Sequence, residues 1–399
     1  MQKIISVNCG SSSLKFQLFE MPEEKVLASG IAERIGLDTG IYTIKVNGEK
    51  HTQELEIKNH EVAVQMLLNS LIEYKIVESL DEIVGSGHRV VQGSDYFNKS
   101  VLETDETLEK VFEFAKLAPL HNKANGEGCK AFKTALPHCK NAFVFDTAFH
   151  QTMTPDVYTY AVPYDWYENH SVRRYGAHGT SHQYVSQRAA ALMNKDIKDT
   201  RIITCHLGNG ASITAVEKGK CVNTSMGFTP LGGIMMGTRS GDIDPAIVSY
   251  MAEELNKTAA EIVHILNKES GMHGVSGISS DARDVENAAD EGNERAILTQ
   301  NIYVNRVINT IGGYILQMGG VDAIVFTAGL GENDVKLRLK ILDAMTIGLG
   351  LSINLEKNEQ RGEELLISNS NSKVDVFVIP TNEELVIARD TYALINGKN

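Results

Sequence analysis

The sequence predicts an α/β protein with mixed sheets, built from two related domains. Segments rich in β-branched residues and bounded by glycine alternate with stretches whose apolar residues recur at helical spacing. The chain also repeats itself: the segment Lys3-Ile-Ile-Ser-Val-Asn-Cys-Gly-Ser-Ser aligns with Arg201-Ile-Ile-Thr-Cys-His-Leu-Gly-Asn-Gly at an offset of 198 residues, almost half of the 399. Both copies have the pattern strand, glycine turn, strand. A chance match of short apolar runs is the alternative.

A weaker echo points the same way, because Ala142-Phe-Val-Phe-Asp146 resembles Ala323-Ile-Val-Phe-Thr327. Together the two matches predict two related domains that face a cleft. Strands are expected at 4–7, 16–19, 42–46, 202–207 and 213–216. The pair Asn47-Gly48 predicts that the third of these strands turns back as a hairpin.

Helices are predicted between the strands from apolar periodicity and end signals. One helical face joins Val62, Met66, Leu67, Leu71 and Tyr74, and another joins Leu108, Val111, Phe112 and Ala115. Asp244-Pro245 is typical of an N-cap followed by proline at the first helical position. Thr258-Ala-Ala-Glu261 and Thr381-Asn-Glu-Glu384 are expected to be capping boxes. The long helix predicted over 294–318 is apolar on more than one face.

Composition excludes several classes of protein. With 42% hydrophobic and 22% charged residues the chain falls in the ordinary globular range. No apolar run approaches the ~18 residues of a spanning helix, and the first residues reach polar positions too soon for a signal peptide. Five cysteines without a C-x-x-C pair indicate neither a disulfide framework nor a zinc site. A reducing, cytoplasmic location is therefore expected.

The net charge of −13 and the absence of basic blocks exclude a nucleic-acid footprint. The same charge repels a phosphorylated small molecule at long range. If such a ligand binds, its cationic partners must be concentrated locally, beside glycine-rich turns.

Neither a P-loop nor a Rossmann fingerprint occurs, so both common phosphate cradles are missing. Three other glycine-rich loops follow predicted strands: Asn8 to Lys15, His206 to Gly210 and Gly329 to Asn333. Each can present backbone N–H groups without bulky Cβ atoms to phosphate oxygens. The alternative is that each loop is merely a tight turn.

Four segments, in order and spread from end to end, resemble the signature segments of the acetate kinase family. They are Asn8-Cys-Gly-Ser-Ser-Ser-Leu-Lys15, Arg174-Tyr-Gly-Ala-His-Gly-Thr-Ser-His182, Met236-Gly-Thr-Arg-Ser-Gly-Asp-Ile-Asp-Pro245 and Pro380-Thr-Asn-Glu-Glu384. The resemblance covers essentially the whole chain. It implies two duplicated actin-like ATPase domains, ribonuclease H-like in topology, with the ligand cleft between them.

The same resemblance implies a phosphotransferase that moves the γ-phosphoryl group of ATP reversibly onto acetate, giving ADP and acetyl phosphate by direct in-line transfer. Such transfer requires positioning and positive charge around the phosphoryl oxygens. By resemblance, Arg89 holds the acetate carboxylate, while His178 and Arg239 stabilise the transition state. His178 and His182 at i, i+4 are an alternative metal pair. We expect no helix there, because glycine follows His178, and no catalytic Glu lies between them.

Resemblance also assigns the metal and the acid–base residues. The family cofactor is Mg²⁺, for which Mn²⁺ can substitute, and Asn8 and Glu383 match its protein ligands. In the predicted capping box Glu384 reaches back to the cap, leaving Glu383 free; the alternative is that Glu383 only favours the helix N-terminus. Asp146 matches the active-site aspartate. Since acetate is already ionised at neutral pH, we expect Asp146 to orient an arginine or a metal-bound water rather than to move a proton.

Nucleotide-binding residues follow from the family match, with Asp281 to Arg283 also open to the interpretation of a solvated ion pair. They are Lys15, His206, Leu207, Gly208, Asn209, Gly210, Asp281, Ala282, Arg283, Gly329, Leu330, Gly331, Glu332 and Asn333. The acetate methyl is expected to contact Val91, Leu120 and Pro230. Ala177 stands where many relatives have phenylalanine, which predicts propionate as a second substrate.

The resemblance places the domains at 1–150, on the acyl side and completed by a C-terminal helix over 383–397, and at 151–382, on the nucleotide side. Substrate binding should draw the two together, and a homodimer is expected. Two rivals remain: an enzyme that prefers propionate or butyrate, and an actin-like nucleotide switch without carboxylate chemistry. Acetate dependence of ATP turnover separates them.

Overall fold

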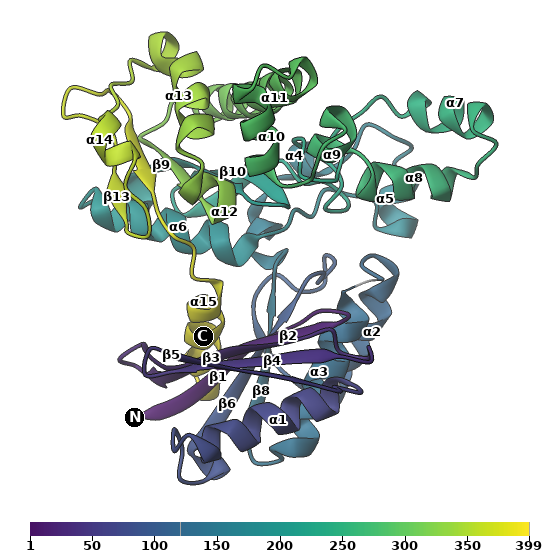
Figure 1. Cartoon of the computed structure of the whole chain (residues 1–399), viewed down its shortest axis with the longest axis vertical. Coiled ribbons are helices and arrows are strands. Elements are labelled where there is room, and N and C mark those ends of the chain that lie inside the picture. The colour runs from purple at the N-terminus through teal and green to yellow at the C-terminus, as the bar shows by residue number, and fades with distance from the viewer. Residues whose placement is uncertain (120, 399) are drawn as a thin grey trace. The chain divides into compact units, whose positions relative to one another are not determined.

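The computed structural model describes residues 1–119 and 121–398, and the chain divides into two compact units. Unit 1 comprises 1–149 and 382–399, so the end of the chain returns to the first unit, and unit 2 comprises 150–381 (Figure 1). Each unit contains one mixed sheet with helices packed on it, which confirms the predicted α/β class. None of the described helices is both long and apolar enough to span a bilayer.

The strands are β1 Gln2–Cys9, β2 Ser13–Met21, β3 Lys25–Glu33, β4 Gly40–Val46, β5 Glu49–Leu55, β6 Ile83–Val90, β7 Val101–Leu102, β8 Lys140–Phe145, β9 Arg201–Leu207, β10 Ala211–Glu217, β11 Lys220–Thr224, β12 Ala323–Thr327, β13 Leu365–Leu366 and β14 Asp375–Val378. The α-helices are α1 His60–Glu73, α2 Asp105–Glu113, α3 Asn122–Ala135, α4 Pro155–Tyr158, α5 Asp165–His170, α6 Gly179–Leu192, α7 Ala246–Glu254, α8 Ala259–Lys268, α9 Gly271–Ser276, α10 Ala282–Asp290, α11 Glu294–Met318, α12 Ala328–Asn333, α13 Val335–Leu349, α14 Leu355–Asn358 and α15 Glu383–Ile395.

The unit 1 sheet has the strand order β5-β4-β3-β2-β1-β6-β8-β7. Strands β1 to β5 form an antiparallel meander, whereas β1, β6 and β8 run parallel, so their carboxyl ends lie at one edge. The hairpin predicted at Asn47-Gly48 is confirmed, because Val46 pairs with Glu49 across it. Both residues of that turn have positive φ, as this kind of two-residue hairpin requires.

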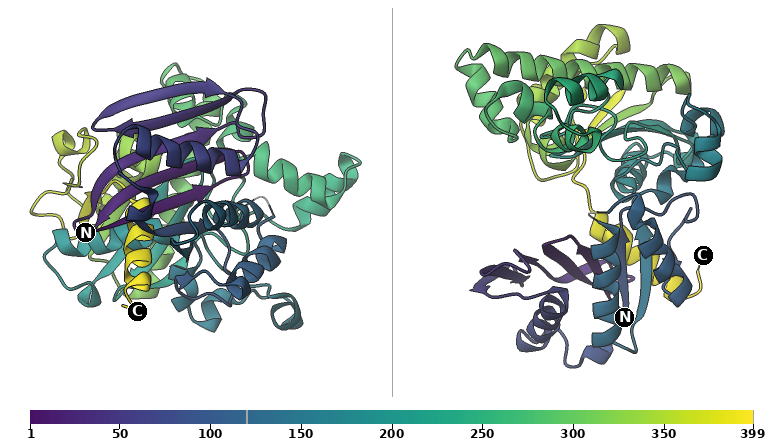
Figure 2. Two further views of the ribbon diagram at one scale, coloured as in Figure 1. Left: turned by 90° about the horizontal axis from the view of Figure 1, so that it is seen from below. Right: turned by 90° about the vertical axis from the view of Figure 1, so that its right-hand side faces the viewer.

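The two faces of the unit 1 sheet carry different helices. Helix α15 packs on β6, β1 and β8, where Gly85 and Gly87 leave room: a Cβ on Gly87 would lie 2.5 Å from Cγ2 of Ile387. Helix α3 packs on the other face, where the ring of Phe132 meets the ring of His88 edge-on. Figure 2 shows α15, in yellow, against the unit 1 strands. Because strand side chains alternate between faces, Arg89 belongs to the face of Gly85, Gly87 and α15.

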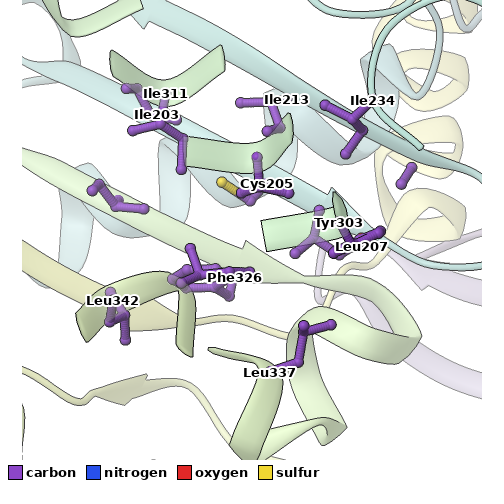
Figure 3. Close-up of a cluster of buried hydrophobic side chains, with 14 of the residues drawn as sticks. Ile203, Cys205, Leu207, Ile213, Ile234, Tyr303, Ile311, Phe326, Leu337 and Leu342 are labelled. Atoms are coloured by element: carbon purple, nitrogen blue, oxygen red, sulfur yellow. The ribbon is translucent and has the colours of Figure 1, made fainter. Parts of the chain in front are cut away.

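The unit 2 sheet has the order β11-β10-β9-β12-β14-β13 and separates an apolar face from a polar one. On the apolar face, Ile203, Cys205, Ile213 and Phe326 pack with residues of α11 and α13 into a buried core, shown in Figure 3. The opposite face carries buried polar residues at the alternating positions of the same strands and is covered by α6. These polar residues are Thr204, His206, Ser212, Thr214 and Thr224.

The main internal repeat is confirmed by topology, but the weaker echo was wrong. Strands β2-β1-β6-β8 match β10-β9-β12-β14 in order and in direction, so the segments beginning at Lys3 and Arg201 occupy equivalent places. The strand Ala323–Thr327 lies next to β9 and therefore corresponds to β6, not to Lys140–Phe145. The shared Ala-x-Val-Phe pattern reflects only that both four-residue stretches, Ala142 to Phe145 and Ala323 to Phe326, are buried.

Helix ends agree with the sequence at Thr258 and depart from it elsewhere. The Thr258 capping box is confirmed, and Asp244 accepts a hydrogen bond from the Ala246 N–H, although the helix begins at Ala246. The box predicted at Thr381 was wrong: Asn382 caps α15 by accepting from the Leu385 N–H, while the Thr381 hydroxyl donates to Ser181. Thr381 and Asn382 are adjacent candidates for the cap. Asn382 takes this role because the Thr381 hydroxyl is bonded to Ser181.

Two further segments are helical where loops were expected. Helix α6 begins directly after His178, whose φ of 58° is left-handed, so a glycine at position 179 does not prevent the helix. Gly329 to Asn333 belongs to the short helix α12 rather than to an open loop. Its start is held by Glu332, which accepts from the Ala328 N–H at 2.7 Å.

Candidate active site

Unit 1 gathers its predicted site residues at the carboxyl ends of the parallel strands. Asn8 pairs with Lys15 across the β1–β2 hairpin, and Val7 pairs with His88, so Asn8 and Arg89 come next on neighbouring strands. Asp146 directly follows β8. Cys9 faces α3, since a Cβ on Gly128 would meet its sulfur, so Asn8 points to the α15 face. Such an edge is where open α/β sheets bind ligands.

Arg89 and Asp146 form a two-point ion pair. Nε of Arg89 donates to Oδ1 of Asp146 at 2.9 Å and Nη2 donates to Oδ2 at 2.6 Å. The Asp146 side chain is 1% exposed, and the Arg89 side chain 21%. Burial alone would lower the pKa of Arg89, but the charges of Asp146 and Glu383 raise it above its ordinary value. Burial raises the pKa of the Asp146 carboxyl, and Arg89 offsets part of that rise.

Glu383 is the first residue of α15, and its charge acts on both members of this pair. An amide oxygen on Asn8 and a carboxylate on Glu383, on the same face of the sheet as the ion pair, are the oxygen donors that Mg²⁺ prefers. The donor set therefore fits the ion, with most of its coordination left to water and phosphate. Among residues 1–119 and 121–398, no group of three or more His, Cys, Asp or Glu side chains is placed to hold a metal by itself.

In unit 2, the side chains of His178 and Arg239 both lie close to Gly210. Measured from the position that a Cβ would occupy on Gly210, Nη1 of Arg239 lies at 3.4 Å and Nε2 of His178 at 3.6 Å. The His178 ring stacks on His206 with a centroid distance of 4.0 Å. Nη1 of Arg239 donates to the Pro230 carbonyl at 3.3 Å, and burial lowers the pKa of Arg239. An imidazole and a guanidinium thus converge on the turn after β9.

Three glycine-rich or charged segments far apart in the sequence line one cavity of about 630 Å³ in unit 2. This volume suits a nucleotide-sized ligand. The lining residues that the sequence predicted are Gly208, Asn209, Asp281, Ala282, Arg283, Gly329, Leu330 and Asn333. Arg283 pairs with Asp281 at 2.5 Å, which lowers the pKa of Asp281 to about 2, and its side chain is 84% exposed.

The other predicted nucleotide residues lie outside this lining. Lys15 belongs to unit 1, where it lines a separate surface cavity with Lys45 and Glu384. In unit 2 the side chain of Leu207 is buried in the core, and Glu332 binds the backbone at Ala328 and Thr381. His206, Gly210 and Gly331 are also absent from the lining.

Sequence reasoning missed six lining residues: Gly237, Met272, Ser280, Glu286, Asp334 and Arg361. Gly237 carried a usable signal, because it falls within the segment 236–245 that resembles the family. Its packing explains the glycine: a Cβ there would lie 2.0 Å from Oδ1 of Asn209. Arg361 had no signal, because nothing in its neighbours distinguishes it from a solvated arginine.

The predicted acyl-pocket residues are divided between the two units. Val91 follows β6 in unit 1, and its N–H donates to Asn125 at 3.2 Å. In unit 2, Pro230 contacts Arg239 through its carbonyl, and Ala177 is 4% exposed beside His178. Leu120 lies outside the described residues.

Comparisons with known proteins find similar proteins over nearly the whole chain. The model of the acetokinase family matches residues 3–389. Acetate kinase of Bacillus velezensis is 54% identical over 394 residues, covering 99% of this chain and 100% of the relative. The crystal structure of acetate kinase from Porphyromonas gingivalis superposes with a TM-score of 0.94 at 46% identity, and that of a propionate kinase from Francisella tularensis with 0.92 at 42%. Both cover 99% of this chain and 100% of their own.

These matches show more than a shared fold, because the sequence identity is high and nearly all of this chain and all of each relative are aligned. The signature segments, the paired sheets and the nucleotide-sized cavity all fall within the matched range. The chain belongs to the acetokinase family.

Proposed function

We propose that this chain is an acetate kinase, which transfers the γ-phosphoryl group of ATP to acetate with Mg²⁺ and works in both directions. One observation carries the proposal: residues from three segments far apart in the sequence line one cavity of nucleotide size, namely Gly208 and Asn209, Asp281 to Arg283, and Gly329, Leu330 and Asn333. The family match over residues 3–389 supports the reaction class.

On the unit 1 side, Arg89 binds the acetate carboxylate. Asp146 occupies the Nε–Nη2 edge of its guanidinium, so acetate would use the remaining N–H groups of Nη1 and Nη2. By the family match, the residues proposed for the acetate methyl are Val91, Leu120 and Pro230.

Asp146 acts in this scheme as a positioning residue rather than a general base. The carboxylate of acetate, with a pKa near that of a side-chain carboxyl, is already ionised at neutral pH and needs no proton removed. A buried carboxylate paired at two points instead fixes the plane of Arg89, and with it the direction of the attacking oxygen.

On the unit 2 side, the cavity holds the nucleotide, and His178 and Arg239 donate to the oxygens of the transferring phosphoryl group. That transition state spreads negative charge over three equatorial oxygens, which two cationic donors beside Gly210 are suited to stabilise. In-line transfer requires the attacking oxygen of acetate and the leaving oxygen of ADP to lie on opposite sides of the phosphorus. Excluding water then prevents hydrolysis of ATP.

Asn8 and Glu383 would hold Mg²⁺. When bound, the ion neutralises charge on the phosphate oxygens. The remaining work in this proposal falls to the protein groups named above.

A coupled assay of ADP formation with and without acetate tests the proposal. We expect turnover to depend on acetate and acetyl phosphate to appear on hydroxamate trapping. ATP hydrolysis at the same rate without acetate would instead identify an actin-like nucleotide switch.

Three finer points belong to the same proposal. Propionate is expected as a second substrate, since Ala177 is small and a propionate kinase is among the similar structures. The five cysteines are buried free thiols, which supports a reducing, cytoplasmic location. We also propose a homodimer, supported by exposed apolar side chains such as Leu316 of α11 and Ile347 of α13. Light scattering tests the oligomeric state.

A further inference from the structure

The polar face of the unit 2 sheet contains a continuous chain of hydrogen bonds that ends at His178. The Ser212 hydroxyl bridges two imidazoles, with its Oγ 2.8 Å from Nδ1 of His178 and 2.8 Å from Nε2 of His182. On the other side of the second ring, Nδ1 of His182 lies 2.7 Å from Oγ1 of Thr204. The Thr204 hydroxyl in turn donates to the backbone carbonyl of Thr214 at 3.4 Å.

The number of protons available determines which group donates and which accepts in each of these hydrogen bonds. A carbonyl oxygen can only accept, so the proton of Thr204 points to Thr214. Oγ1 of Thr204 then accepts from Nδ1–H of His182. Burial lowers the pKa of His182 well below its ordinary value, so this ring is neutral and its Nε2 accepts.

The direction continues through Ser212. A hydroxyl has one proton, and Ser212 donates it to Nε2 of His182, so its oxygen accepts from Nδ1 of His178. This assignment is the one that satisfies all four contacts at once. With the opposite direction, the contact between Thr204 and the Thr214 carbonyl is lost.

We propose that Thr204, His182 and Ser212 are positioning residues that fix the proton of His178 on Nδ1 and so reserve its Nε2 for the phosphoryl group. This inference rests on the proposed role of His178. Nε2 is the nitrogen that lies near Gly210 and Arg239, on the phosphoryl side. To donate there, the ring must gain a second proton at Nε2, and Ser212 stabilises that imidazolium by accepting from Nδ1.

Some groups around the His178 ring favour its imidazolium form, and others disfavour it. Arg239, near Nε2, and His206, stacked on the ring, disfavour a second positive charge, whereas the phosphoryl oxygens favour it. His182 is neutral, and His150 lies behind it with a centroid distance of 5.7 Å. Burial lowers the pKa of His150 to about 4, so that ring adds no charge near neutral pH. The hydroxyl of Ser212 is thus the fixed acceptor for the Nδ1 proton.

Two substitutions probe the chain at different points. Ser212→Ala removes the acceptor, lowers the pKa of His178 and should move the alkaline limb of the kcat profile to lower pH by about one unit. Thr204→Val acts without touching His178: His182 loses the partner of its Nδ1–H, its proton moves to Nε2, and Ser212 then donates to Nδ1 of His178. The neutral His178 ring then carries its proton on Nε2 and can donate to the phosphoryl group without a second proton, so the alkaline limb should flatten instead of moving.

Thr224→Val is the matched control. Thr224 is a buried threonine of β11, the neighbour of β10, and it lies on the same polar face of the sheet. Its hydroxyl contacts Oγ1 of Thr214 at 2.8 Å and takes no part in the hydrogen bonds that lead to His178. Its pH profile should equal that of the wild type. Thr204→Ser, which keeps the hydroxyl, should restore the profile that Thr204→Val loses.

Nitrogen NMR of the full chain labelled at histidine reads the same arrangement without reference to activity. The neutral His178 ring should carry its proton on Nδ1 in the wild type and on Nε2 in Thr204→Val. A wild-type proton on Nε2, or equal profiles for Thr204→Val and Thr224→Val, would overturn the inference. A His178→Gln variant with undiminished kcat would remove the proposed role of His178, whereas the NMR result still decides where the proton lies.

Discussion

Asp146 holds Arg89 along one edge of its guanidinium, with Nε and Nη2 each donating to a different carboxylate oxygen. The pair joins the ends of two parallel strands, because Arg89 lies near the end of β6 and Asp146 follows β8. The pair fixes the orientation of the Arg89 guanidinium, so its other edge faces a defined direction. Removing the carboxylate frees the guanidinium to rotate.

Asp146→Asn should therefore lower kcat/KM for acetate by about 100- to 1,000-fold while ATP binding changes little. The amide keeps the shape of the side chain but loses the charge that orients Arg89. Steady-state kinetics with each substrate varied in turn measures the effect. Asp390→Asn, which alters a mostly buried carboxylate of α15 bonded to Ser100, is the control and should retain activity. An equal loss in both variants would contradict the positioning role.

Gly210→Ala should fold normally and lose about 100-fold in kcat. The new methyl group meets Arg239 and His178 at ordinary van der Waals distances, so the packing tolerates it. It nevertheless occupies the space on which both donors converge. Thermal unfolding and kcat are measured together, with Gly312→Ala in α11, where nothing lies within 4 Å of the added Cβ, as the control. Full activity of Gly210→Ala would exclude a phosphoryl group from this position.

Asn382→Ala should loosen the first turn of α15, because Oδ1 of Asn382 accepts from the Leu385 N–H at 3.0 Å. A lost N-cap costs about 1 kcal/mol, which accelerates exchange of that amide about fivefold if the turn opens locally. Hydrogen exchange of Leu385 is the measurement. Thr381→Ala leaves the cap in place and should not change it. The reverse pattern would restore the capping box that the sequence predicted at Thr381.

Acid should destabilise unit 1 through His88. Burial lowers the pKa of His88 from 6.5 to about 4, so between these values the unfolded chain binds more protons than the folded one. The free energy of unfolding therefore falls as the pH falls from about 6.5 to about 4. In His88→Phe, whose ring would take the place between Phe132 and Phe143, this fall should be shallower. Urea unfolding across the window measures the slope.

Ser86→Ala serves as the control for that measurement. It removes a hydrogen-bond partner of His88 and costs stability, but it keeps the titrating ring. Its pH slope should stay close to that of the wild type. If His88→Phe keeps the wild-type slope as well, another group causes the acid sensitivity.

Propionate should be phosphorylated with a kcat/KM within a thousandfold of that for acetate. One added methylene discriminates by only ~1–3 kcal/mol unless the wall of the pocket excludes it. Hydroxamate trapping of the two acyl phosphates compares them under identical conditions. A larger gap would show that the neighbours of Ala177, itself 4% exposed, already fill the space of the missing ring.

Local signals predicted most of the fold, and tertiary partners account for what they missed. The Asn47-Gly48 hairpin, the Thr258 cap and the helix 294–318 depend on neighbouring residues, and all three are confirmed. Thr381 failed as a cap because its hydroxyl bonds Ser181, 200 residues away in the sequence. The likeness of Ala142 to Asp146 with Ala323 to Thr327 failed because burial, not common position, produces that pattern.

The candidate site divides in the same way. Glycine marks backbone that approaches another group closely, so turns such as Gly208 to Gly210 could be found from the sequence. From the sequence, Asp146 was expected to orient either an arginine or a metal-bound water. The coordinates were needed to show its two-point ion pair with Arg89. His182 drew attention only as an alternative metal ligand, and its bridge to His178 through Ser212 could not be found, because that bridge depends on how α6 lies on β9 and β10.

The placement of α15 has a consequence for biosynthesis. The surface that receives this helix, around Gly85 and Gly87, is made early, whereas α15 leaves the ribosome only after all of residues 150–381. Throughout that interval the strip of the sheet that α15 later covers stays uncovered by it. A chaperone that shields this strip until α15 emerges would raise the yield of native enzyme, and a chain that stalls before residue 382 would be a target for proteolysis.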